Sequence, residues 1–113
     1  MEIITTDYTM VDGTTIPLSL NYGLLFKLRA KDKGIYKAYN EALTSMKEEP
    51  EYGSAIVLYT AYACGHLKDH NDISDMMSME DFFTSMSQDR AYNAQVAQEI
   101  YSPNQKKASA KRS

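Results

Sequence analysis

Residue types that build crosslinks or rigid turns are scarce in this sequence. Among 113 residues there are one cysteine, Cys64, no tryptophan, three prolines and five glycines. A lone cysteine excludes an internal disulfide framework, so the fold must rest on its apolar core, and the compartment is expected to be reducing. There is no glycine-rich linker and no internal repeat, which favours one compact unit.

Segments that would direct the chain into a membrane are also missing. The N-terminal residues, 1–7, contain no basic stretch followed by an apolar run. No window approaches the roughly 18 apolar residues that are needed to span a bilayer. We therefore expect neither secretion nor membrane insertion.

The motifs of common enzyme classes are absent as well, because no G-x-S-x-G, P-loop or G-x-G-x-x-G pattern occurs. His66 and His70 are four residues apart with Asp69 and Asp72 nearby, a spacing that a zinc or nickel site could use. A role of the histidines at a helix end is favoured, since they interact well with the terminal carbonyls. Cys64 lies in an apolar helical pattern, which favours a small core residue over a nucleophile with a histidine base. We expect no enzyme activity, no metal and no cofactor.

The charge of the chain is unevenly distributed. Residues 104–113 hold four of the 12 basic residues and no acid, so residues 1–103 carry 8 basic against 15 acidic residues, a formal charge of −7. An acidic body repels nucleic acid phosphates, and we expect no nucleic acid partner. A local basic stretch with Tyr36 and Tyr39 nearby is interpreted as a solvated face of two helices; its members are Lys27, Arg29, Lys31, Lys33 and Lys37.

The N-terminal segment has the pattern of a β-hairpin that leads into a helix. Residues 8–11 and 14–18 flank Asp12-Gly13, which predicts a two-residue type I′ turn. Asn21 is placed to accept a backbone N–H of the first helical turn. Gly23 is expected to let that turn pack closely against a strand. Tyr22 belongs to the same apolar pattern, which is more typical of the core.

The remaining chain has helical periodicity. We predict a helix with one buried face after the break at 31–34, a central helix entered at Pro50 and buried on several sides, and a polar loop at 68–72. Ser78 with Asp81 predicts a cap before a fourth helix, and a last helix is expected over 89–101, ended by Ser102-Pro103. The predicted fold is α+β, mainly α, with a hairpin (1–20) and four to five helices in one compact bundle (21–103). Residues 104–113 are expected to be a disordered basic tail.

Three segments in this order carry a family resemblance. They are L-N-Y-G-L-L-F at 20–26, the alanine- and aromatic-rich segment 56–67, and S-M-E-D-F-F at 78–83. Together they resemble the small tail assembly chaperones of long-tailed bacteriophages and prophages. The resemblance implies a non-enzymatic protein of the host cytoplasm that shields the tape measure protein until tail tube protein displaces it, and that is absent from the mature virion. It also implies a longer product made by frameshifting. A homo-oligomer is expected from the aromatic and methionine content.

Aromatic and methionine side chains are the candidates for partner binding. Met76 and Met77 precede the predicted cap and favour an exposed edge, whereas the apolar stripe that follows is more typical of a core. The full candidate set is Tyr36, Tyr39, Met76, Met77, Phe82 and Phe83. Two other functions stay open: a virion adaptor, such as a head-to-tail connector or tail-completion subunit, and a small metal-dependent enzyme that uses His66, His70 and Asp69.

Overall fold

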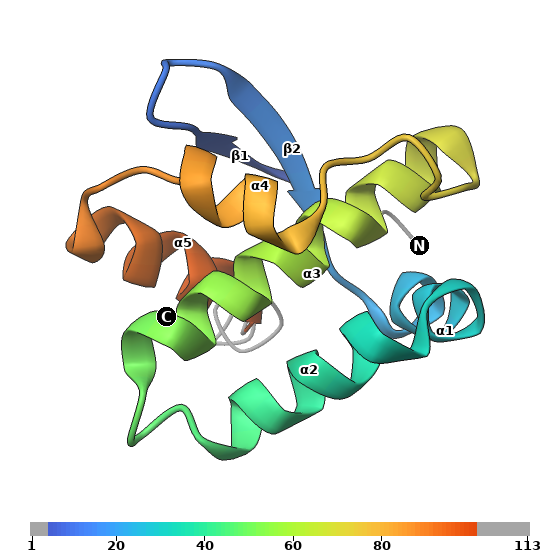
Figure 1. Cartoon of the computed structure of the whole chain (residues 1–113), viewed down its shortest axis with the longest axis horizontal. Coiled ribbons are helices and arrows are strands. Elements are labelled where there is room, and N and C mark those ends of the chain that lie inside the picture. The colour runs from blue at the N-terminus through green and yellow to red at the C-terminus, as the bar shows by residue number, and fades with distance from the viewer. Residues whose placement is uncertain (1–4, 102–113) are drawn as a thin grey trace, which may run out of the picture.

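The computed structural model describes residues 5–101 and contains a two-stranded hairpin followed by five helices (Figure 1). The elements are β1 (Thr5–Thr9), β2 (Thr15–Ser19), α1 (Tyr22–Lys31), α2 (Lys33–Thr44), α3 (Pro50–His70), α4 (Met79–Ser85) and α5 (Arg90–Tyr101). The predicted hairpin-then-helices order and the α+β, mainly α class are confirmed. The predicted helix end at Ser102-Pro103 and the tail at 104–113 lie outside the described residues.

The hairpin has a longer loop than the sequence predicted. β1 and β2 are antiparallel and end at the pair Thr9 and Thr15. The amide of Met10 donates to the carbonyl of Thr14 at 2.7 Å, so three residues form the loop. Within this loop only Gly13 has a positive φ, of 89°, whereas a type I′ turn needs two such residues. The two-residue turn was therefore wrong. Asp12 still contributes, because its side chain accepts the amide of Thr14 at 2.9 Å.

Two side-chain caps set the ends of the first helices. Asn21 accepts the amide of Leu24 at 2.8 Å, which confirms the predicted cap of α1. Asp32 ends α1 and begins α2, because its own amide bonds to the carbonyl of Leu28 while its carboxylate accepts the first amides of α2, at Gly34 and Ile35. The chain therefore turns sharply between α1 and α2.

Helix α3 runs through the centre of the molecule, with α1 and α2 on one side and the hairpin, α4 and α5 on the other (Figure 1). Twelve of its residues are buried, as the all-round apolar pattern predicted. It begins at Pro50 as expected. It continues to His70 and ends at Asn71 in the left-handed conformation, with φ of 58°. The polar segment 68–70 is thus the last helical turn, and the loop predicted over 68–72 begins only at Asn71.

The close helix–strand contact that was expected at Gly23 occurs at a different glycine. Gly23 is exposed, and a β-carbon there would meet only the side chain of Asn21 at 3.4 Å, so that expectation was wrong. A β-carbon at Gly65 would lie 3.0 Å from the carbonyl oxygen of Pro17 on β2. Gly65 therefore allows the centre of α3 to approach the hairpin.

The C-terminal helices are fastened to the hairpin by a polar network around Tyr8. The Tyr8 hydroxyl donates to Asn93 Oδ1 at 2.6 Å and accepts the amide of Ser87 at 2.9 Å. Asn93 in turn donates to the carbonyl of Ser87 at 2.9 Å, and the Tyr92 hydroxyl accepts the amide of Thr9 at the same distance. The first strand and the last helix are thereby linked across the whole domain.

Residues of α4 complete the core. Ser78 accepts the amide of Asp81 at 3.1 Å, so the predicted cap is present. Phe82 is fully buried between rings of the hairpin and α3: it stacks on Tyr8 with the centroids 6.3 Å apart and meets Tyr59 edge-on at 5.3 Å. Over residues 5–101, no helix has the length and hydropathy to cross a bilayer.

Candidate partner-binding surface

Three aromatic rings gather on the outer side of the α1–α2 corner. Tyr22 and Phe26 stack with their centroids 5.8 Å apart, and the edge of Tyr36 on α2 meets Phe26 at 6.4 Å. Tyr22 is 76% exposed and Phe26 55% exposed. Single exposed apolar residues are common on protein surfaces, but adjoining rings from two helices form a contiguous patch. We call Tyr22, Phe26 and Tyr36 the aromatic face.

The helical period explains why these rings point outward. The leucines of α1 occupy the opposite side of the helix and are buried; they are Leu24, Leu25 and Leu28. Tyr22, Phe26 and Arg29 follow one another at i, i+4 and i+7, so they share a stripe that the core does not cover. The Arg29 guanidinium carbon lies 5.8 Å from the centroid of the Tyr36 ring, within the range of a cation–π contact.

Four basic residues lie on the same two helices as the aromatic face, each within three residues of Phe26 or Tyr36. Lys27, Arg29, Lys33 and Lys37 are all exposed. Throughout the described part of the chain, no carboxylate forms an ion pair with any of the four. Asp32 is the single acid in residues 22–40, and its carboxylate is engaged in capping α2. The surface is therefore apolar at its centre and positively charged at its rim.

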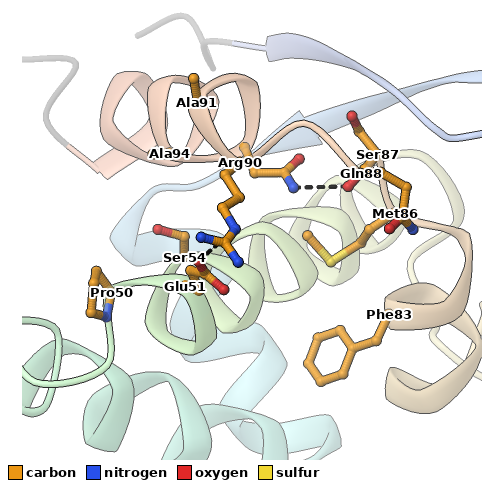
Figure 2. A pocket seen from close by; sticks show the side chains of 11 residues that line it. Pro50, Glu51, Ser54, Phe83, Met86, Ser87, Gln88, Arg90, Ala91 and Ala94 are labelled. Carbon is orange, nitrogen blue, oxygen red and sulfur yellow. Dashed lines mark hydrogen bonds and ion pairs between the residues drawn. The ribbon is translucent and has the colours of Figure 1, made fainter.

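A second feature is an open cleft of about 600 Å³ between the start of α3, the end of α4 and the start of α5. Phe83 and Met86 supply apolar lining from α4 and its C-terminal end. Figure 2 shows Arg90 reaching from α5 toward Glu51 on α3, where its Nε lies 2.9 Å from the carboxylate. Both side chains are well exposed, so this ion pair contributes little to the free energy of folding.

The structure separates the aromatic candidates that were predicted for partner binding. Tyr36 is half-buried and belongs to the aromatic face, and Phe83 is half-buried and lines the cleft. Tyr39 is 6% exposed and Phe82 is fully buried, so both lie in the core and neither presents a surface. Tyr36 and Tyr39 therefore differ: Tyr36 lies at the surface and Tyr39 lies in the interior.

The two methionines that were expected at an exposed edge are half-buried against the core. The backbone of Met77 is held by two tyrosines of α3: Tyr59 donates its hydroxyl to the carbonyl, and Tyr62 accepts the amide, each at 2.8 Å. Burial raises the pKa of Tyr59 to about 12, so this donor stays protonated. Met76 and Met77 therefore lie on a fixed segment beside the aromatic core.

The histidines and the cysteine are at or near the end of α3. His66 Nε2 lies 2.7 Å from Asp75 Oδ1, and the rings of His66 and His70 are 4.3 Å apart between centroids. Asp69 lies instead 3.9 Å from the amine of Lys68. Within residues 5–101 no three His, Cys, Asp or Glu side chains gather as a metal site. Cys64 is buried, and burial raises its thiol pKa to about 12, as its apolar setting predicted.

The exposed members of the aromatic face were missed from the sequence. Tyr22 was interpreted as a core residue and is the most exposed large apolar side chain of the described residues. The usable signal was the i, i+4, i+7 series of Tyr22, Phe26 and Arg29, which runs opposite three leucines.

Comparison of the chain with models of protein families, with curated proteins and with solved structures found no match.

Proposed function

We propose that this protein is a non-enzymatic tail assembly chaperone that binds the tape measure protein through the aromatic face. The observation that carries the proposal is the pair of stacked, solvent-exposed rings of Tyr22 and Phe26. The order of hairpin, L-N-Y-G-L-L-F segment and helices, which resembles that family, supports the same function. Aromatic rings are enriched at the buried centres of protein interfaces, because each removes a large apolar area from water.

The mode of action needs only reversible contacts. A tape measure protein is a long helical chain with apolar stripes, and many chaperone copies along it would each cover a short stretch. Several weak contacts to one chain give avidity, yet the copies leave one at a time when tail tube protein offers a better surface. In this proposal the chaperone acts in the host cytoplasm, can self-associate, and remains outside the finished virion.

Co-expression tests the proposal directly. The chain is co-expressed with the matching tape measure protein, and we expect a higher soluble yield and a co-purifying complex. The double variant Tyr22→Ser, Phe26→Ser should lose both effects. The matched control is Val11→Ser, Tyr52→Ser, which removes two side chains that are 56% and 53% exposed and lie outside the face. Unchanged solubility with the wild-type chain, or equal loss in both double variants, would contradict the proposal.

The fate of the protein separates a chaperone from a virion adaptor. If the protein is a chaperone, quantitative mass spectrometry should not detect this chain in purified particles. A constant number of copies per particle would reject the chaperone and favour a connector or tail-completion subunit.

A further inference from the structure

The charge around the aromatic face is opposite to the charge of the rest of the protein. Residues 22–40 contain five basic residues and one acid, a formal charge of +4, in a chain whose total is −3. The acid, Asp32, is already bonded to the amides of Gly34 and Ile35. Lys31 interacts electrostatically with the Asp72 carboxylate, whereas Arg29 and Lys33, at the rim of the face, form no ion pair among the described residues.

The arrangement places cations where a bound partner would partly exclude water. Arg29 lies over Tyr36, and Lys33 is on the same stripe of α2 as Tyr36, three residues before it. A charge pair at the edge of an apolar contact is screened less than one in open solvent, and it sets the orientation and the rate of association. Carboxylates on a partner would thus be selected at this rim.

The spacing of the rings indicates the form of the partner. Successive centroids, from Tyr22 to Phe26 and from Phe26 to Tyr36, are 5.8 and 6.4 Å apart. Residues four apart on a helix rise by about 6 Å, so apolar side chains at i, i+4 and i+7 or i+8 of a partner helix would reach consecutive rings. The apolar stripe of an amphipathic helix matches this spacing.

We infer that the aromatic face selects an acidic amphipathic helix, whose apolar stripe covers Tyr22, Phe26 and Tyr36 and whose flanking Asp or Glu side chains pair with Arg29 and Lys33. This inference rests on the proposed function for its choice of surface, and it adds the chemistry of the bound segment. The formal charge of −7 over residues 1–103 favours a peptide over a nucleic acid, because a polyanion as long as DNA would also meet the acidic body.

Synthetic peptides test the selectivity without the tape measure protein. The first peptide is a 21-residue amphipathic helix with Glu on both flanks of a stripe of Leu and Phe. The second peptide has Lys at every Glu position. Fluorescence anisotropy with the full chain should give at least about tenfold tighter binding of the Glu peptide in low salt, with the preference shrinking as salt is added. Nuclear magnetic resonance shifts should be concentrated on α1 and the first half of α2.

Matched variants assign the effect to the two parts of the face. Phe26→Ser should weaken binding of the Glu peptide by about tenfold or more, whereas Tyr52→Ser should leave its affinity unchanged. Arg29→Glu should weaken binding of the Glu peptide and strengthen binding of the Lys peptide. Lys47→Glu, which makes the same change of net charge at an exposed residue between α2 and α3, should do neither. Circular dichroism checks that each variant retains the helical fold.

The outcomes are distinct from those of the co-expression experiment. Selective binding of the Glu peptide supports the inference even where the tape measure protein stays insoluble, in which case only the proposed function fails. Equal binding of both peptides overturns the inference. So does tight binding of a dT oligonucleotide that Arg29→Glu abolishes, which would assign the face to nucleic acid. A dimer that Phe26→Ser dissociates, without peptide binding, would assign the face to a second copy of this chain.

Discussion

The hydroxyl of Tyr8 offers the sharpest test of how the two ends of the domain are joined. Tyr8 is fully buried, and its oxygen makes two hydrogen bonds, to Asn93 Oδ1 and from the Ser87 amide. Burial is the main cause that raises the pKa of Tyr8, so the group is a neutral donor at neutral pH. Tyr8→Phe keeps the ring stacking and removes both bonds at once.

The expected loss of stability depends on the hydrogen-bonding groups that remain when the Tyr8 hydroxyl is removed. Each net hydrogen bond is worth about 1 kcal/mol, and leaving a buried partner unsatisfied costs about 1–3 kcal/mol. Because Asn93 retains its bond to the Ser87 carbonyl and Ser87 is only half-buried, we expect a loss of about 2–3 kcal/mol in the free energy of unfolding. For a domain of this size that corresponds to a fall in Tm of about 10 °C.

Urea unfolding followed by circular dichroism gives the measurement, and Tyr22→Phe supplies the control. The Tyr22 hydroxyl belongs to a side chain that is 76% exposed, so its removal should change the stability by less than about 0.5 kcal/mol. Hydrogen exchange should also show faster exchange at the amides of Thr9 and Ser87 in Tyr8→Phe. A Tyr8→Phe variant as stable as Tyr22→Phe would refute the idea that this network fastens α5 to the hairpin.

Three further predictions concern other parts of the fold. Gly65→Ala should lower the free energy of unfolding by about 1 kcal/mol, because its β-carbon would press on the Pro17 carbonyl, whereas exposed Gly23→Ala should raise it by about 0.5 kcal/mol; equal thermal shifts would contradict the close contact. Cys64, with a pKa of about 12, should resist a thiol reagent at pH 8 and react fully in urea, and rapid labelling of the folded chain would show that it is accessible. Asp75→Asn should destabilise the protein near pH 6. The hydrogen bond from His66 lowers the pKa of Asp75 below its usual 3.8, so this contribution is present above about pH 4 and is lost as the pH falls through the lowered pKa. A stability difference that persists unchanged at pH 2.5 would show that the carboxylate is not responsible.

Local signals in the sequence were sufficient where one side chain decides the structure. Asn21 and Ser78 cap helices because their side chains reach amides three residues ahead, which depends only on nearby residues. The Asp12-Gly13 pair was less decisive, since it suits both a two-residue turn and the observed three-residue loop. At 68–70, polar residues fit an exposed helical turn as well as a loop, and the left-handed Asn71 sets the end.

Long-range packing was beyond the sequence. The local sequence does not distinguish Gly23 from Gly65. They differ because strand β2 packs against Gly65 and not against Gly23. Tyr22 and Tyr39 lie on similar helical stripes, yet one is 76% exposed and the other 6%, because α3 covers only one side of the α1–α2 corner. Residues available for partner binding are those that the packed core leaves exposed, so a periodic pattern alone could not identify them.

The bond between Tyr8 and Asn93 joins residues 85 positions apart. During synthesis, the N-terminal hairpin leaves the ribosome long before α5 exists, and until then the Tyr8 hydroxyl lacks its acceptor on Asn93. Contacts of such wide sequence separation close late and slow the folding of a small domain. A nascent chain stalled before α5 should therefore remain open to proteases, and shortening the gene from its 3′ side should loosen the opposite end of the polypeptide.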